Sequence, residues 1–92
     1  MSEHRKTITI VNQRGLHARA SAKFVGAVAE LPATTQVKVA KDGNEAAGGS
    51  ILGLMMLGAA KGDTVELIVA GDNAEAVLAD LSTLVENGFG EE

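Results

Sequence analysis

With 92 residues, of which 46% are apolar and 22% are charged, the chain fits one globular domain over residues 1–92 and differs from a disordered chain. It contains no cysteine, which excludes a disulfide framework and a thiolate metal site and favours the cytoplasm over secretion. The net charge of −4 argues against a nucleic-acid-binding protein, and residues 51–60, the longest mostly apolar stretch, are too short for membrane insertion.

The first predicted elements are a strand and a helix. Residues 7–11 alternate polar and apolar side chains, all of them β-branched, which is typical of a strand with Ile8 and Ile10 facing a core. From residue 16 to residue 31 apolar side chains recur at helical spacing, and Pro32 ends the run.

The middle of the chain predicts a hairpin and a short helix. Residues 36–39 alternate again, and Asp42-Gly43 before residues 44–47 indicates a tight turn between two paired strands. Ser50 is then the expected N-cap of a helix over residues 51–57, which a glycine follows.

The last elements are a strand over residues 64–70 and a helix that ends near Asn87-Gly88. Asp72 and Glu75 have the spacing of a capping box at the start of this helix. Its apolar stripe consists of Ala74, Val77, Leu78, Leu81, Leu84 and Val85. The order strand, helix, strand, strand, helix, strand, helix predicts an α+β fold with three helices on one face of a four-stranded, mainly antiparallel sheet.

The start of the first helix breaks two local rules. Gly15-Leu16-His17 supplies none of the usual capping residues, and Arg19 adds positive charge at the positive end of the helix dipole. Free backbone N–H groups, a guanidinium and an imidazole would then converge, which describes an anion site. Histidine titrates close to neutral pH, so its neutral ring can attack phosphorus without a separate base. The alternative is that His17 is an incidental loop residue and Arg19 a solvated one.

The charge distribution supports the anion site, because an acidic group or surface would be drawn to the N-terminal part. No basic residue follows Lys61, and Glu3 is the only acid before position 24. Five of the eight basic residues lie in that first part: Arg5, Lys6, Arg14, Arg19 and Lys23.

Three segments carry a resemblance to a known family. Gly15-Leu16-His17-Ala18-Arg19 resembles the phosphorylation-site motif of HPr, the histidine-containing phosphocarrier of the bacterial phosphotransferase system. The resemblance continues in the serine-led segment Ser50-Ile51-Leu52-Gly53-Leu54 and in the turn Lys61-Gly62-Asp63, and so covers nearly the whole chain.

The resemblance implies an open-faced sandwich in which His17 accepts a phosphoryl group through Nδ1 from Enzyme I, itself charged by phosphoenolpyruvate, and delivers it to an enzyme IIA domain. It implies that Arg19 stabilises the phosphate. The backbone N–H groups of Ala18 and Ala20, at the start of the predicted helix, are further candidate phosphate donors. The family usually has proline where this chain has Ala20. We expect this change to tune transfer without abolishing it, because alanine regains a backbone N–H.

Two segments look more like the nitrogen-related branch of the family, NPr, than like the sugar-transport branch. They are residues 54–57 and the tail 85–92. A role in nitrogen regulation and one in sugar uptake both stay open.

The short helix is too apolar for one buried face, since six of residues 51–57 are large and apolar. We expect Ile51, Leu52 and Met55 to be exposed, where the family has its docking patch. Ser50 is either a helix cap or a site of regulatory phosphorylation by an HPr serine kinase/phosphorylase.

The leading hypothesis is a monomeric covalent carrier and not an autonomous catalyst. The alternatives are an unphosphorylated regulatory module that binds partners through residues 51–57, and a small anion-binding domain. No cofactor or metal is expected, because His4 and His17 are far apart and lack a ligand cluster.

Overall fold

The computed structural model describes residues 3–91, so Met1, Ser2 and Glu92 of the expected domain lie outside the described residues. Its elements are β1 (Glu3–Thr9), α1 (Ala18–Ala29), β2 (Gln36–Lys41), β3 (Asn44–Ala47), α2 (Ile51–Met56), β4 (Thr64–Ala70), α3 (Ala74–Glu86) and a short 3-10 helix, η1 (Gly88–Gly90). The predicted order is confirmed, and η1 is an addition that the sequence pattern did not predict.

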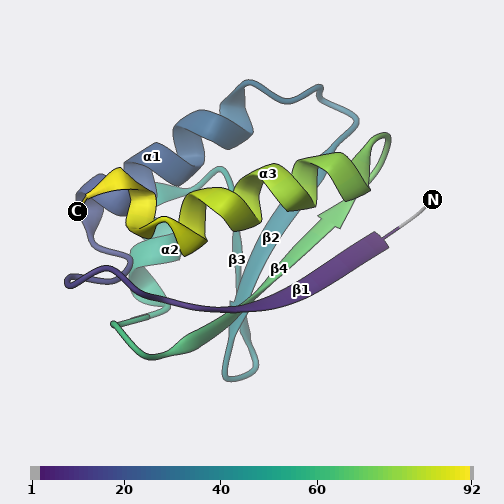
Figure 1. Ribbon diagram of the computed structural model, residues 1–92. Coiled ribbons are helices and arrows are strands. Elements are labelled where there is room, and N and C mark those ends of the chain that lie inside the picture. Colours follow the sequence, from purple (N-terminus) through teal and green to yellow (C-terminus); the bar gives the residue numbers. More distant parts are fainter. Residues whose placement is uncertain (1–2, 92) are drawn as a thin grey trace.

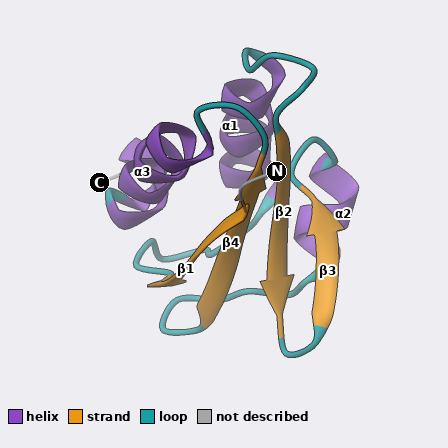
Figure 2. Cartoon of the chain, turned by 90° about the vertical axis from the view of Figure 1, so that its right-hand side faces the viewer, coloured by secondary structure: helices purple, strands orange, loops and turns teal. Residues whose placement is uncertain are grey.

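The four strands form one sheet in the order β1-β4-β2-β3, and every neighbouring pair is antiparallel. The helices lie on one side of this sheet, with α3 over β1 and β4 and with α2 beside β3 and α1 (Figures 1 and 2). The predicted α+β open-faced sandwich is therefore confirmed. None of the helices within residues 3–91 is long and apolar enough to cross a bilayer.

The core lies between the sheet and the helices. Ile8 and Ile10 are buried there, as their alternation predicted, and Phe24 and Leu54 enter from α1 and α2. Full burial of one such side chain contributes about 1.5–3 kcal/mol, so these contacts hold α1 and α2 against the sheet.

The first strand spans Glu3–Thr9 and not the predicted residues 7–11, whereas the first helix begins after His17, as expected. β1 starts at Glu3 because pairing with β4 continues from Glu3 opposite Ala70 to Thr9 opposite Thr64. α1 begins directly after His17, and Leu16, which precedes His17, is tied to another loop because its N–H donates to the carbonyl oxygen of Ala59 at 2.9 Å.

The capping box predicted for the last helix is wrong. The N-cap of α3 is Asn73, whose backbone is left-handed (φ 59°) and whose side chain makes no capping hydrogen bond. Glu75 is therefore the second helical residue, one position too early for a capping box. Asp72 instead offers its carbonyl oxygen to the Thr35 hydroxyl at 3.4 Å.

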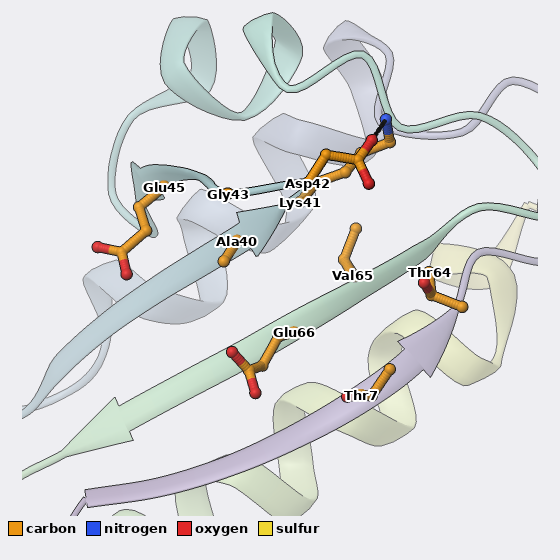
Figure 3. Close-up of a pocket in the computed structure, with 9 residues that line it drawn as sticks. All are labelled: Thr7, Ala40, Lys41, Asp42, Gly43, Glu45, Thr64, Val65 and Glu66. Carbon is orange, nitrogen blue, oxygen red and sulfur yellow. Dashed lines mark hydrogen bonds and ion pairs between the residues drawn. The ribbon is translucent and has the colours of Figure 1, made fainter.

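The face of the sheet away from the helices is largely polar. A shallow hollow on it is lined by residues of β1, β2 and β4 and of the β2-β3 hairpin, including Thr7, Glu66 and Lys41 (Figure 3). The Lys41 ammonium contacts the carboxylates of Asp42 at 2.9 Å and Asp63 at 3.9 Å, and the Asp42 hydrogen bond raises the pKa of Lys41. The Lys41 ammonium is therefore already paired with neighbouring carboxylates.

Candidate functional site

A tight loop between β1 and α1 positions His17. Gly15 has a φ of +60°, and a Cβ at this residue would lie 2.1 Å from the carbonyl oxygen of Ala59. Only glycine allows the two loops to approach so closely, and the approach makes the hydrogen bond between Leu16 and Ala59. The buried Asn12 side chain adds a second tie, because its Nδ2 donates to the Gly15 carbonyl oxygen at 2.8 Å.

The helix start is capped by His17 itself, which corrects the expectation of an uncapped end. His17 is extended (φ −77°, ψ −177°), and its Nδ1 accepts a hydrogen bond from the Arg19 N–H at 3.2 Å. Nδ1 is bonded to Cγ, as the side-chain oxygen of an asparagine cap is, so the ring can take the same role. The first N–H groups of a helix have no intrahelical acceptor, so those of Ala18 and Ala20 point to the same end of α1.

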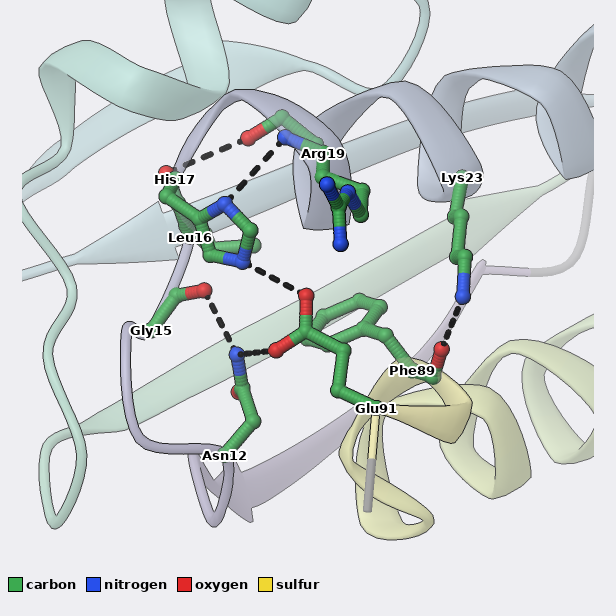
Figure 4. A network of polar contacts seen from close by, with 9 residues as sticks. Asn12, Gly15, Leu16, His17, Arg19, Lys23, Phe89 and Glu91 are labelled. Atoms are coloured by element: carbon green, nitrogen blue, oxygen red, sulfur yellow. Dashed lines mark hydrogen bonds and ion pairs between the residues drawn. The ribbon is translucent and has the colours of Figure 1, made fainter.

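The cap determines which ring nitrogen carries the proton. A backbone N–H only donates, so Nδ1 must be unprotonated and the proton of the neutral ring lies on Nε2. Nε2 faces the Glu91 carboxylate, with 2.6 Å between Nε2 and Oε2 (Figure 4). His17 therefore presents a lone pair at the helix N-terminus and an N–H at the carboxylate.

Glu91 is the site residue that the sequence analysis missed. The C-terminal segment folds back beside the N-terminal end of α1 (Figure 1), with Phe89 buried and its carbonyl oxygen accepting from Lys23 Nζ at 2.8 Å. Asn12 Nδ2 donates to Glu91 Oε1 at 3.1 Å. The glycines that flank Phe89 were a turn signal, but no local pattern connects residue 91 with residue 17.

A hollow of about 460 Å³ adjoins the histidine. Arg14, Arg19 and Lys23 line it together with His17 and Glu91, so the structure gathers three of the five N-terminal cations there. The other two lie on β1 in ion pairs, Arg5 with Glu3 and Glu66, and Lys6 with Glu86. The hollow can receive an anion next to Nδ1.

The Glu91 carboxylate is held in its ionised form. Burial opposes ionisation, but the hydrogen bonds from Asn12 and His17 and the charges of His17 and Lys23 outweigh it and lower the pKa of Glu91. A carboxyl whose pKa is lowered by folding stabilises the fold above its unfolded pKa and loses this contribution as the pH falls through the folded value.

We therefore expect the C-terminal segment to stay docked at neutral pH and to loosen only when the pH falls below 4.5, the ordinary value for glutamate. An acid titration of the Phe89 amide shift by NMR measures this. Glu91→Gln, which has no carboxyl, should lack the transition. A transition centred above that pH, or one of equal size in the variant, would contradict the assignment.

The short helix exposes most of its apolar side chains. Ile51, Leu52 and Met55 are 41%, 68% and 41% exposed, as predicted, and Met56, which was not singled out, is 77% exposed. Leu54 is fully buried and holds the helix to the core. The exposed side chains form an apolar patch, whose docking role stays a prediction.

Ser50 caps α2, since its Oγ accepts from the Gly53 N–H at 2.9 Å and its backbone is extended. The cap accounts for a serine at this position. Regulatory phosphorylation of Ser50 stays a prediction.

The chain is similar to known phosphocarrier proteins in both sequence and fold. A family profile described as "PTS HPr component phosphorylation site" matches residues 4–87. Phosphocarrier protein HPr of Neisseria meningitidis serogroup A is 46% identical over 88 residues, which is 95% of this chain and 96% of the relative. Phosphocarrier protein NPr of Shewanella violacea is 34% identical over 91 residues, 99% of this chain and 98% of the relative. The crystal structure of HPr-C-His from Thermoanaerobacter tengcongensis, 40% identical, superposes with a TM-score of 0.87 over 100% of this chain and 99% of that one.

Proposed function

Because the chain belongs to the HPr family of phosphocarriers of the phosphotransferase system, we propose that His17 is its phosphoryl acceptor and Arg19 its phosphate-stabilising partner. The observation that carries this proposal is the state of the ring: Nδ1 is unprotonated and faces the N-terminus of α1, beside a hollow lined by cations. A nucleophile in this state needs no base.

The proposed transfer exchanges one hydrogen bond for another. When Nδ1 bonds to phosphorus, its lone pair is used and the Arg19 N–H is released, so this N–H can donate to a phosphoryl oxygen at the same place. The N–H groups of Ala18 and Ala20 and the Arg19 guanidinium are the further donors in the proposal. The Ala20 methyl is fully buried, so this residue acts through its backbone.

The partners in this proposal are Enzyme I as donor and enzyme IIA domains as acceptors. The exposed apolar side chains Ile51, Leu52 and Met55 are the proposed docking patch, since flexible methionine suits a surface that binds several partners in turn. The carrier is proposed to work as a monomeric domain over residues 1–92 in the cytoplasm.

Two finer points belong to the same proposal. The relatives include both HPr and NPr, so sugar uptake and nitrogen-related regulation are both candidate roles, and transfer rates to the two types of enzyme IIA domain separate them. Phosphorylation of Ser50 by an HPr serine kinase/phosphorylase would place negative charge at the start of α2, next to the docking patch, and weaken binding to acidic partners.

The test is phosphorylation by the upstream donor. Incubation with phosphoenolpyruvate, magnesium and Enzyme I should give an acid-labile, base-stable adduct of one phosphoryl group, which mass spectrometry places on His17. His4→Gln is the matched control, because His4 lies in β1 opposite Val69 and away from the hollow. This variant should be phosphorylated as fast as the wild type. An unmodified wild type, or an adduct on any other residue, would sink the proposal.

A further inference from the structure

Glu91 contacts the ring nitrogen that the proposed transfer does not use. Nδ1 faces the Arg19 N–H, and Nε2, on the other side of the ring, faces the Glu91 carboxylate at 2.6 Å (Figure 4). We propose that Glu91 is a positioning residue for His17, which fixes the ring through Nε2–H and stabilises the positive charge that the ring acquires when Nδ1 bonds to phosphorus. This inference rests on the function proposed above.

The orientation of the ring follows from its two hydrogen bonds. The bond from the Arg19 N–H is long, at 3.2 Å, and alone it would leave the ring free to turn about the Cβ–Cγ bond. The second bond, at 2.6 Å to an ionised carboxylate, is short, as charge-assisted hydrogen bonds are, and it fixes the position of the other ring nitrogen. Together they aim the Nδ1 lone pair at the helix N-terminus.

The charge balance of the transfer gives the carboxylate a second role. The Nδ1 lone pair forms the bond to phosphorus, the bond between phosphorus and the phosphorylated donor protein breaks, and the donor keeps that electron pair. No proton leaves Nδ1, because it carries none, and Nε2 retains its proton. The ring therefore becomes positively charged, and a carboxylate bonded to Nε2–H stabilises this form, as the aspartate of a Ser-His-Asp triad does.

A carboxylate near an incoming phosphoryl group also repels it. Here the carboxylate lies on the Nε2 side of the ring, and the phosphoryl group would add at Nδ1, on the other side. Lys23, which lowers the pKa of Glu91 through its charge, and the arginines that line the hollow, Arg14 and Arg19, offset the repulsion. The attraction to the ring acts at hydrogen-bond distance and should outweigh it.

The surroundings of Glu91 are built to hold it. Asn12 is 1% exposed, and both groups within reach of its amide, the Gly15 carbonyl and the Glu91 carboxylate, only accept hydrogen bonds. Nδ2 must therefore face them, which leaves Oδ1 buried without a partner among the described residues. A buried unsatisfied oxygen breaks a rule of stable folds, and such exceptions concentrate at functional sites.

The experiment compares Glu91→Ala, which removes the contact, with Glu91→Gln, which keeps an acceptor but no charge. Glu86→Ala is the matched control, because Glu86 is an exposed glutamate close to the same end of the chain whose carboxylate pairs with Lys6 at 3.4 Å. Two quantities are measured: the His17 Nε2–H signal by NMR in the unphosphorylated protein, and the rate of phosphorylation by Enzyme I.

We expect a downfield, slowly exchanging Nε2–H signal in the wild type and the control, and its loss in Glu91→Ala. The phosphorylation rate should fall about tenfold or more in both Glu91 variants and stay unchanged in the control. An unaltered signal in Glu91→Ala, or a Glu91 variant that reacts as fast as the wild type or faster, would overturn the inference. The NMR signal needs no phosphorylation, so a wild type that shows the signal but accepts no phosphate would refute the proposed function and not the contact.

Discussion

His17→Ala is expected to lose phosphorylation completely and His17→Asn to lose it equally, yet the alanine variant should be less stable than the asparagine variant by about 1 kcal/mol. The reason is that His17 has two tasks, which the structure places on one atom: Nδ1 is the proposed nucleophile, and it also caps α1. Asparagine places its oxygen on the same Cγ, so it keeps the cap and removes only the chemistry. Urea unfolding of the two variants and mass spectrometry after incubation with Enzyme I measure the two tasks separately.

Both variants lose the contact with Glu91, so the difference between their unfolding free energies isolates the cap. Equal stability of the two would mean that the hydrogen bond from Arg19 contributes nothing to the helix. A phosphorylated product from either variant would place the acceptor on another residue.

The fold was predictable because its elements have regular apolar patterns and clear end signals. The hairpin follows from Asp42-Gly43, whose left-handed φ values of 52° and 86° are those of the tight turn expected there. The bounds of β4 match the predicted strand, and Ser50 is the cap that was expected of it. In each case the signal and the structure it specifies lie within a few residues of each other.

The errors concern contacts between residues distant in the sequence. β1 begins at Glu3 because its partner strand continues, although residues 3–6 have no alternating pattern of their own. The capping box predicted for α3 was wrong because the chain turns at Asn73 through a left-handed backbone, which the sequence did not indicate. Glu91 lies 74 positions from His17, so no spacing rule could connect the two.

The site combines both kinds of information. The motif around His17 and the cationic N-terminal part both predicted an anion site. The protonation state of the ring follows only from its two hydrogen-bond partners, Arg19 and Glu91. Histidine is not one of the usual N-cap residues, yet the His17 ring caps α1. The expectation of an uncapped helix end was therefore wrong, and the anion site at this helix end stays a prediction.

Gly15→Ala should destabilise the protein by about 3 kcal/mol or more, because three costs add: a left-handed alanine, a clash, and a lost hydrogen bond. The backbone at Gly15 has a φ of +60°, and the new Cβ would lie 2.1 Å from the Ala59 carbonyl oxygen, the same atom that accepts from the Leu16 N–H. Separating the two loops would also move His17, so phosphorylation should slow as well.

Gly26→Ala is the matched control. Gly26 lies inside α1 with no heavy atom within 4 Å of the added Cβ, so alanine should raise the unfolding free energy by about 0.5–1 kcal/mol. Urea denaturation of both variants tests the pair, and a Gly15→Ala protein as stable as the wild type would show that the close approach of the two loops is not what requires glycine in this motif.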